Sequence, residues 1–319
     1  MSQVEIKPER IRTFQYVFFL SLFLILPGAQ WPLFFWLNGL IPLVVFLFLY
    51  GFGWKMGGLI LLSGALTACA VSMYLSFFPF FLFSLTAFPA GYVIAYAAGR
   101  TEDQITTGMK GVLCLGGCGL LFWAGLIAID NTFTYSGVIQ QVQQGMDAVL
   151  KSYRNSSSIP VDRLLEIDQV FSQVKSIFPI ILPAILGNSI ILTIWLTIAG
   201  GNGLALRFFG KRPWLEYKYW NLPDKFIWVS IASALFALIP DTRFHSIGIN
   251  CLLMCGIVYV FQGVAILVYF FDKWRVPYFF RLPLYTLAAI QSTGTVLLMI
   301  AGIADIWMDF RKIHKEKSA

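Results

Sequence analysis

The feature that most constrains this chain is its apolar sequence, which leaves only short polar gaps. At least nine runs of roughly 15 to 26 residues carry almost no charge. An α-helix needs about 20 such residues to cross the ~30 Å hydrocarbon layer of a bilayer, and a soluble core does not need so many in series. The pattern predicts an all-α, polytopic transmembrane helix bundle.

Composition and charge agree with a lipid environment. Hydrophobic residues make up 58% of the 319 residues and charged residues only 12%, whereas soluble domains carry about 25% charged residues. This is too little charge to cover a water-soluble globule. The net charge is +7, but the basic residues stand at the ends of apolar runs, which favours anchoring and orientation at a lipid surface over nucleic-acid binding.

The apolar segments predict eight to nine spans. They lie at about 14–29, 32–51, 57–74, 76–98, 109–129, 176–199, 225–240, 247–271 and 283–307. A cytoplasmic N-terminus places most basic residues inside, as the positive-inside rule requires. Nine crossings, however, leave the basic C-terminal tail outside. An even count is the alternative, with one re-entrant or broken segment, either the run before Pro27 or the stretch from Val276.

The polar gaps divide the chain into three regions. Residues 1–130 hold the N-terminal transmembrane helices, and residues 176–319 hold the C-terminal ones together with a basic cytoplasmic loop at 200–225. Residues 131–175 contain two amphipathic stretches separated by a turn before Pro160, which predicts an extracytoplasmic helical hairpin. The loop at 200–225 interleaves cations with aromatic residues, which favours an interfacial anchor on anionic lipid over nucleotide stacking.

One segment carries a small residue at every fourth position for three turns. The residues of this small-residue stripe are Ala87, Gly91, Ala95 and Gly99. Small side chains let another helix approach closely in lipid, where packing rather than hydrophobic drive joins helices. The stripe indicates either packing inside the bundle or a docking face for another membrane subunit.

Signatures of enzymes and metal sites are missing from the pattern. Carboxylates occur at the ends of the predicted spans, at Asp130, Asp241, Asp272 and Asp305. Asp305 and Asp309 share a helix face near Arg311 and Lys312, which predicts a charged interfacial cap in preference to a metal site. The five cysteines fall within apolar runs and serve there as small apolar residues. We therefore expect no enzyme activity, no catalytic residue, no metal and no cofactor.

Neutral amides are the polar groups that remain within the spans. They are Asn38, Asn188, Asn250, Gln262 and Gln291. Amides in lipid must find partners, and several of these stand beside Pro or Gly, the arrangement with which transporters build sites near the bilayer midplane. They are candidate solute-binding residues, or else they join helices. The leading hypothesis is a protein that binds or transports a small solute; the alternative is a membrane scaffold for cell-envelope or division proteins.

Several short motifs occur in an order that resembles a known family. They are an early Pro-rich pair of segments ending in Tyr50-Gly51-Phe52-Gly53, the stretch Trp220-Asn221-Leu222-Pro223, the run Tyr259-Val260-Phe261-Gln262-Gly263, and the ending Gly302-Ile303-Ala304-Asp305. The chain is similar to the YybS-like family of bacterial multi-pass membrane proteins, which have a domain of unknown function. This resemblance implies a multi-pass protein of the bacterial plasma (inner) membrane.

The N-terminal half is also similar to the substrate-binding S components of energy-coupling-factor transporters. That similarity implies capture of a small solute together with separate membrane subunits. The chain departs from those proteins in one respect. They dock through small residues on their first helix, whereas residues 14–26 are bulky here and the small-residue stripe lies in the fourth predicted segment.

Overall fold

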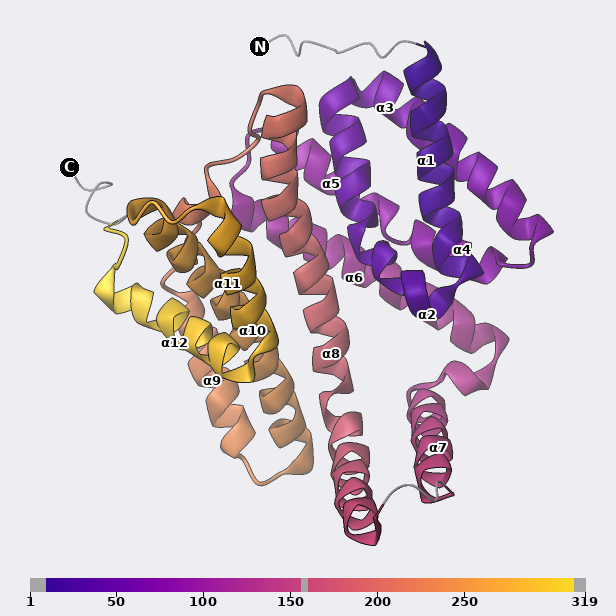
Figure 1. Cartoon of the computed structure of the whole chain (residues 1–319), viewed down its shortest axis with the longest axis vertical. Coiled ribbons are helices and arrows are strands. Elements are labelled where there is room, and N and C mark those ends of the chain that lie inside the picture. The colour runs from indigo at the N-terminus through magenta and orange to yellow at the C-terminus, as the bar shows by residue number, and fades with distance from the viewer. Residues whose placement is uncertain (1–9, 156–159, 313–319) are drawn as a thin grey trace.

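The computed structural model describes residues 10–155 and 160–312, and these residues form helices joined by short connections, without a strand among them (Figure 1). The N-terminal elements are α1 (Arg10–Ala29), α2 (Trp31–Phe34), the 3-10 helix η1 (Phe35–Leu40), α3 (Ile41–Tyr74), α4 (Phe78–Leu85), α5 (Phe88–Gly99) and α6 (Gln104–Ile129). After η2 (Asn131–Phe133) come α7 (Tyr135–Arg154), α8 (Val161–Phe209), η3 (Tyr217–Tyr219), α9 (Phe226–Leu238), α10 (Thr242–Lys273), α11 (Tyr278–Ile290) and α12 (Ser292–Met308).

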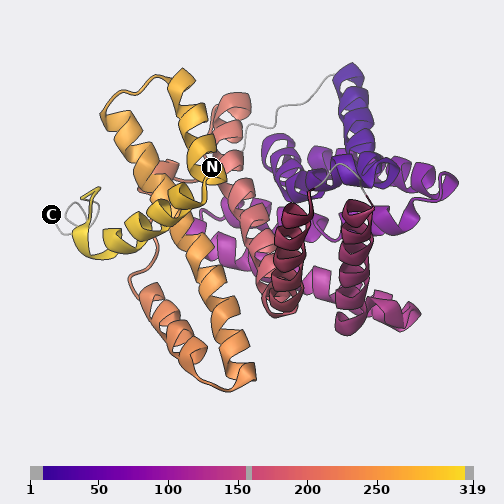
Figure 2. The same ribbon diagram turned by 60° about the horizontal axis from the view of Figure 1, so that its bottom comes forward.

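Helix α8 runs between two groups of helices. In both views α1 to α5 lie on one side of α8 and α9 to α12 on the other, and α6 passes behind α8 in Figure 1 (Figures 1 and 2). On the N-terminal side, Ile194 of α8 is buried in one core with Phe46 and Ile94. On the other side, Asn250 Oδ1 accepts a hydrogen bond from the backbone N–H of Ala184 (2.7 Å). Helix α8 therefore joins the two halves of the molecule.

Helix α3 is bent back on itself at Gly53. This residue has φ 76° and ψ 169°, a conformation that favours glycine because it has no Cβ. A Cβ placed on Gly57 would lie 2.3 Å from the carbonyl oxygen of Phe48, so the two arms of α3 are in backbone contact just beyond the bend. The segments predicted at 32–51 and 57–74 are the two arms.

The predicted count of eight to nine spans is not confirmed. Within the described part of the chain, six helices are long and apolar enough to cross a membrane, with Trp31–Tyr74 counted as one, and a bent pair at α11 and α12 adds a seventh. The segment predicted at 225–240 is the 13-residue helix α9. At 1.5 Å per residue it is about 20 Å long, shorter than the ~30 Å hydrocarbon layer.

The C-terminal segment is broken, as one of the two sequence alternatives proposed. Helices α11 and α12 meet at an angle of 99°, and Gln291 between them has an extended backbone. The run before Pro27 is not broken, because α1 continues through Pro27 to Ala29.

The hydrophilic insert forms two helical arms that lie side by side. Arg154 of α7 pairs with Asp168 of α8 (2.6 Å), and Lys175 of α8 pairs with Asp147 of α7. The second arm continues without interruption into the next span, so α8 has 49 residues and is about 74 Å long. The amphipathic helices are thus present as predicted, and their extracytoplasmic location stays a prediction.

Candidate functional site

The connection between α8 and α9, which we call loop 210–225, is packed against the protein interior. Trp214 and Leu222 are 7% and 5% exposed. The backbone N–H of Trp214 donates to Asn202 Oδ1 of α8 (3.2 Å), and its ring stacks on Phe46 with centroids 5.6 Å apart. Trp214 therefore packs inside the protein and not at a lipid surface, which the sequence had suggested for this loop.

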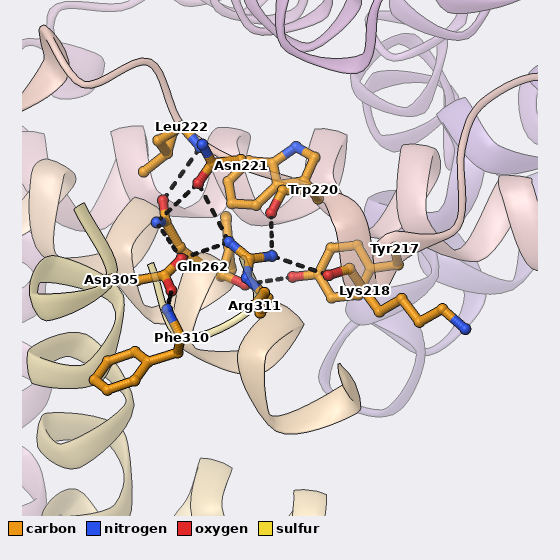
Figure 3. A network of polar contacts seen from close by, with 10 residues as sticks. Tyr217, Lys218, Trp220, Asn221, Leu222, Gln262, Asp305, Phe310 and Arg311 are labelled. Carbon is orange, nitrogen blue, oxygen red and sulfur yellow. Dashed lines mark hydrogen bonds and ion pairs between the residues drawn. The ribbon is translucent and has the colours of Figure 1, made fainter. Parts of the chain in front are cut away.

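Arg311 ties the end of the chain to loop 210–225 (Figure 3). Its side chain is 0% exposed and pairs with Asp305 of α12, 3% exposed, at 2.6 Å. The same guanidinium donates to the carbonyl oxygens of Lys218 (2.9 Å) and Trp220 (2.7 Å), and to Asn221 Oδ1 (3.2 Å). We call these residues, together with Gln262, the Arg311 clasp.

Gln262 of α10 completes the clasp. Its Nε2 donates to Asp305 Oδ2 and to Asn221 Oδ1, both at 3.2 Å, and its Oε1 accepts from the backbone N–H of Leu222 (3.2 Å). Gln262 lies about 16 Å from the end of α10 at Lys273 and about 30 Å from its start, at 1.5 Å per residue. The Asp305–Arg311 pair is therefore placed beside the interior of a candidate span.

Sequence reasoning missed this buried ion pair. It placed Asp305 and Arg311 at the end of a span as an interfacial cap, and Asp305 is indeed in the last turn of α12. The sequence could not reveal that α12 ends beside Gln262. The left-handed conformation of Asp309 (φ 41°) ends the helix there, and the chain then turns so that Arg311 faces Asp305. The one signal of this ion pair in the sequence was that Arg311 follows Asp305 closely along the chain.

Tyr217 fixes loop 210–225 to α8 and α10. Its hydroxyl accepts from Trp195 Nε1 (2.9 Å) and donates to the carbonyl oxygen of Phe261 (2.6 Å). Burial raises the pKa of this phenol far above its usual value. Tyr217 is therefore a neutral bridge between the two helices.

A cavity of about 390 Å³ lies between loop 210–225, α8, α10 and α11. Its lining combines charged side chains with tyrosine rings and small or aliphatic residues. The lining residues are Ala199, Asn202, Gly203, Arg212, Glu216, Tyr217, Lys218, Val268, Asp272, Tyr278, Arg281, Leu282 and Tyr285. Lys218 links this cavity to the clasp: its carbonyl oxygen accepts from Arg311, and its side chain extends away from Arg311 (Figure 3).

The charged residues of the cavity form one alternating chain, which we call the ion-pair ladder. It runs from Arg212 to Glu216 (2.5 Å), to Lys218 (2.8 Å), to Asp272 (3.2 Å) and to Arg281 (2.6 Å). Hydrogen bonds from Lys218 and then Arg212 lower the pKa of Glu216. The hydrogen bond to Glu216 raises the pKa of Lys218 despite partial burial. Glu216 and Lys218 are therefore held in their charged forms near neutral pH.

The predicted amides are spread over the molecule and lie outside the residues that line this cavity. Asn38 accepts from Ser84 Oγ (2.7 Å) in the N-terminal half. Two of the amides join α8 to α10. Asn250 of α10 accepts from the backbone N–H of Ala184, and Asn188 of α8 donates to the carbonyl oxygen of Leu253 (3.4 Å). Gln262 belongs to the clasp, and Gln291 is exposed at the α11–α12 bend. The structure does not bring these five residues together, and their role in solute binding stays a prediction.

The small-residue stripe faces α3 over most of its length. Ala87 and Ala95 are 6% and 3% exposed. A Cβ on Gly91 would lie 2.6 Å from the carbonyl oxygen of Pro42, whereas one on Gly99 would meet nothing within 4 Å. The stripe thus lets α5 pack closely on α3 inside the molecule.

Comparison with known families agrees with a chain built from apolar helices. Residues 17–306 match the family described as "Predicted membrane protein (DUF2232)". The chain belongs to this family. Within DUF2232 the match extends from Val17 in α1 to Ile306 in α12. It includes loop 210–225, the residues that line the cavity, and the clasp without Arg311. No curated protein and no solved structure matches the chain.

Proposed function

We propose that this member of the DUF2232 family binds a small solute in the cavity beside loop 210–225, as a binding or transport protein and not as an enzyme. The observation that supports the proposal is the cavity itself. Its volume of about 390 Å³ is typical of small-molecule sites, which combine apolar walls with a few placed polar groups. Five charged side chains lie among its lining residues and could orient a polar group of the solute.

We propose that the protein lies in the bacterial plasma membrane with its N-terminus and loop 210–225 in the cytoplasm. The Arg311 clasp supports this arrangement, because it holds the C-terminal end against loop 210–225. Arg311 and Lys312, which follow the last helix, are then on the same side as the basic loop, in accord with the positive-inside rule. The similarities to YybS-like proteins and to S components support the same location and solute capture by analogy.

Filling the cavity tests the proposed function. Gly203 lines it, and a Cβ there would meet nothing within 4 Å, so Gly203→Trp can occupy the space without a backbone clash. Gly145→Trp on α7 is the matched control, since that position is equally open. Purified protein is screened by thermal shift against vitamins, nucleosides and organic acids. We expect at least one compound to stabilise the wild type and Gly145→Trp but not Gly203→Trp; absence of any stabilising compound refutes the proposal.

A membrane scaffold is the second candidate, and the exposure of α6 favours it. None of the residues in the most apolar window of α6 is buried. Gly117 and Gly125 lie on the same side of the helix, are exposed, and have open space where a Cβ would be. Exposed glycines in lipid suit close approach of another helix.

A photo-crosslinking side chain placed at Leu121 of α6, which is 75% exposed, tests the scaffold. We expect one discrete protein adduct in native membranes, lost on Gly117→Phe. The control position is Phe279 of α11, 81% exposed. Equal labelling of lipid from both positions counts against a scaffold.

A further inference from the structure

The ion-pair ladder carries one more positive than negative charge. Arg212, Lys218 and Arg281 are its cations, and Glu216 and Asp272 lie between them. In a partly buried site an unbalanced charge is costly, and a bound group of opposite charge would remove the imbalance. We propose that the cavity takes an organic anion, with one carboxylate or phosphate group held at the Arg212 end of the ladder. This inference rests on the proposed solute-binding function.

The hydrogen bonds of the two arginines locate the anion at Arg212. Each of the three guanidinium nitrogens of Arg281 already donates a hydrogen bond, Nε to Val276 O (2.8 Å), Nη1 to Asp272 (2.6 Å) and Nη2 to Phe271 O (3.2 Å). Among the described residues, Arg212 pairs with Glu216 alone, through Nη1, and its side chain is 35% exposed. The other N–H groups of its guanidinium are thus available to a carboxylate or phosphate, which bind such a planar fork well.

The remaining walls point to an apolar body on that anion. Val268, Leu282 and the small residues Ala199 and Gly203 also line the cavity. Tyr285 is half-buried against Phe271, with ring centroids 5.4 Å apart. Apolar and aromatic groups beside charged ones suit an amphipathic organic acid. A free acid and an anionic lipid headgroup share this chemistry.

The test uses four probes that share a phenyl ring. They are 4-phenylbutanoate, phenyl phosphate, 4-phenylbutanamide and 4-phenylbutylamine, titrated by calorimetry into the full chain in phosphatidylcholine nanodiscs. We expect the two anions to bind at least about tenfold more tightly than the amide and the amine, because a charge-assisted hydrogen bond is roughly twice as strong as a neutral one.

A matched pair of variants assigns the contact. Arg212→Gln is expected to weaken 4-phenylbutanoate binding by about tenfold. Arg163→Gln, which removes a comparable ion pair on the hairpin (Arg163 with Glu166, 2.9 Å), is expected to leave it unchanged. Equal thermal stability of both variants shows that folding is preserved.

The outcomes separate the anion inference from the proposed function. If the amide or the amine binds as tightly as the carboxylate, or if Arg212→Gln binds like the wild type, the anion inference is overturned while solute binding stands. If neither the probes nor the compound screen stabilises the protein, the proposed function fails. Nanodiscs containing phosphatidylglycerol identify the source: competition with the probe assigns a lipid headgroup, and unchanged probe affinity assigns a free solute.

Discussion

Removal of Arg311 is expected to be among the most damaging single substitutions in the chain. Arg311→Met deletes the ion pair to Asp305 and the hydrogen bonds to loop 210–225. Among the residues that the structure describes, Asp305 then keeps Gln262 Nε2 and the backbone N–H of Phe310 (3.0 Å) as its side-chain partners. Because the carboxylate stays buried without its counter-charge, the free energy of unfolding should fall by about 3–5 kcal/mol, the range measured when one partner of a buried pair is removed.

A second substitution separates the charge from the packing. In Asp305→Asn/Arg311→Met no buried charge is left, and the double variant should recover most of the lost stability. Lys110→Met is the control, because Lys110 pairs with Glu102 at an exposed position, with side chains 48% and 20% exposed. Its expected cost is below about 1 kcal/mol.

Unfolding in mixed micelles with rising SDS, followed by tryptophan fluorescence, measures these differences. Trp214 and Trp220 lie in the affected loop and should report its release. A loss below about 1 kcal/mol for Arg311→Met would refute the reasoning that the clasp is a dry ion pair. The compensation would be refuted if the double variant lost as much stability as Arg311→Met and Asp305→Asn lose in sum.

Three further predictions concern the packing, capping and ionisation of other positions. Gly91→Ala should destabilise the protein by about 1–3 kcal/mol, because its Cβ would meet backbone, whereas Gly99→Ala in the same stripe should be near neutral; thermal unfolding of the two variants decides this. Asp103 accepts from two backbone N–H groups at the start of α6, so Asp103→Ala should cost about 1 kcal/mol in the same assay. Glu216 has a lowered pKa, so its contribution to stability is present above its ordinary value of 4.5 and is lost as pH falls through the lowered value. Lys218 has a raised pKa, so its contribution is present below 10.5 and is lost as pH rises through the raised value. The difference in melting temperature between the wild type and Glu216→Gln should therefore be constant between about pH 6 and 9 and disappear in acid; a difference that persists in acid would contradict the ion-pair assignment.

Hydropathy and helical periodicity predicted where the helices are better than they predicted how many helices are long enough to span a membrane. The apolar runs correspond to helices, and the two amphipathic stretches of the insert correspond to α7 and the start of α8. The count of spans is not confirmed, and α9 is one reason, because hydropathy does not report where a helix ends. Helix α9 begins at Phe226, next to the predicted start at 225, but it ends at Leu238.

The candidate site was harder to predict, because its residues come from distant parts of the sequence. The five amides were selected because they are polar groups within predicted spans. Of these five, only Gln262 belongs to the Arg311 clasp. The cavity depends on Arg212, Lys218, Asp272 and Arg281, which stand at the ends of spans and look like ordinary anchors. Only the tertiary structure pairs them across loop 210–225, α10 and α11.

The sequence by itself determined that this chain is helical and belongs in lipid, because unbroken apolar runs have few other stable solutions when backbone groups must be satisfied without water. The tertiary structure decided where the charges go. Ion pairs such as Lys218 with Asp272 form between segments whose relative depth depends on bends at Gly53, Gln291 and Asp309 and on the packing of loop 210–225. These relative depths are set by contacts between segments that are far apart in the sequence, and a local window of sequence does not contain such contacts.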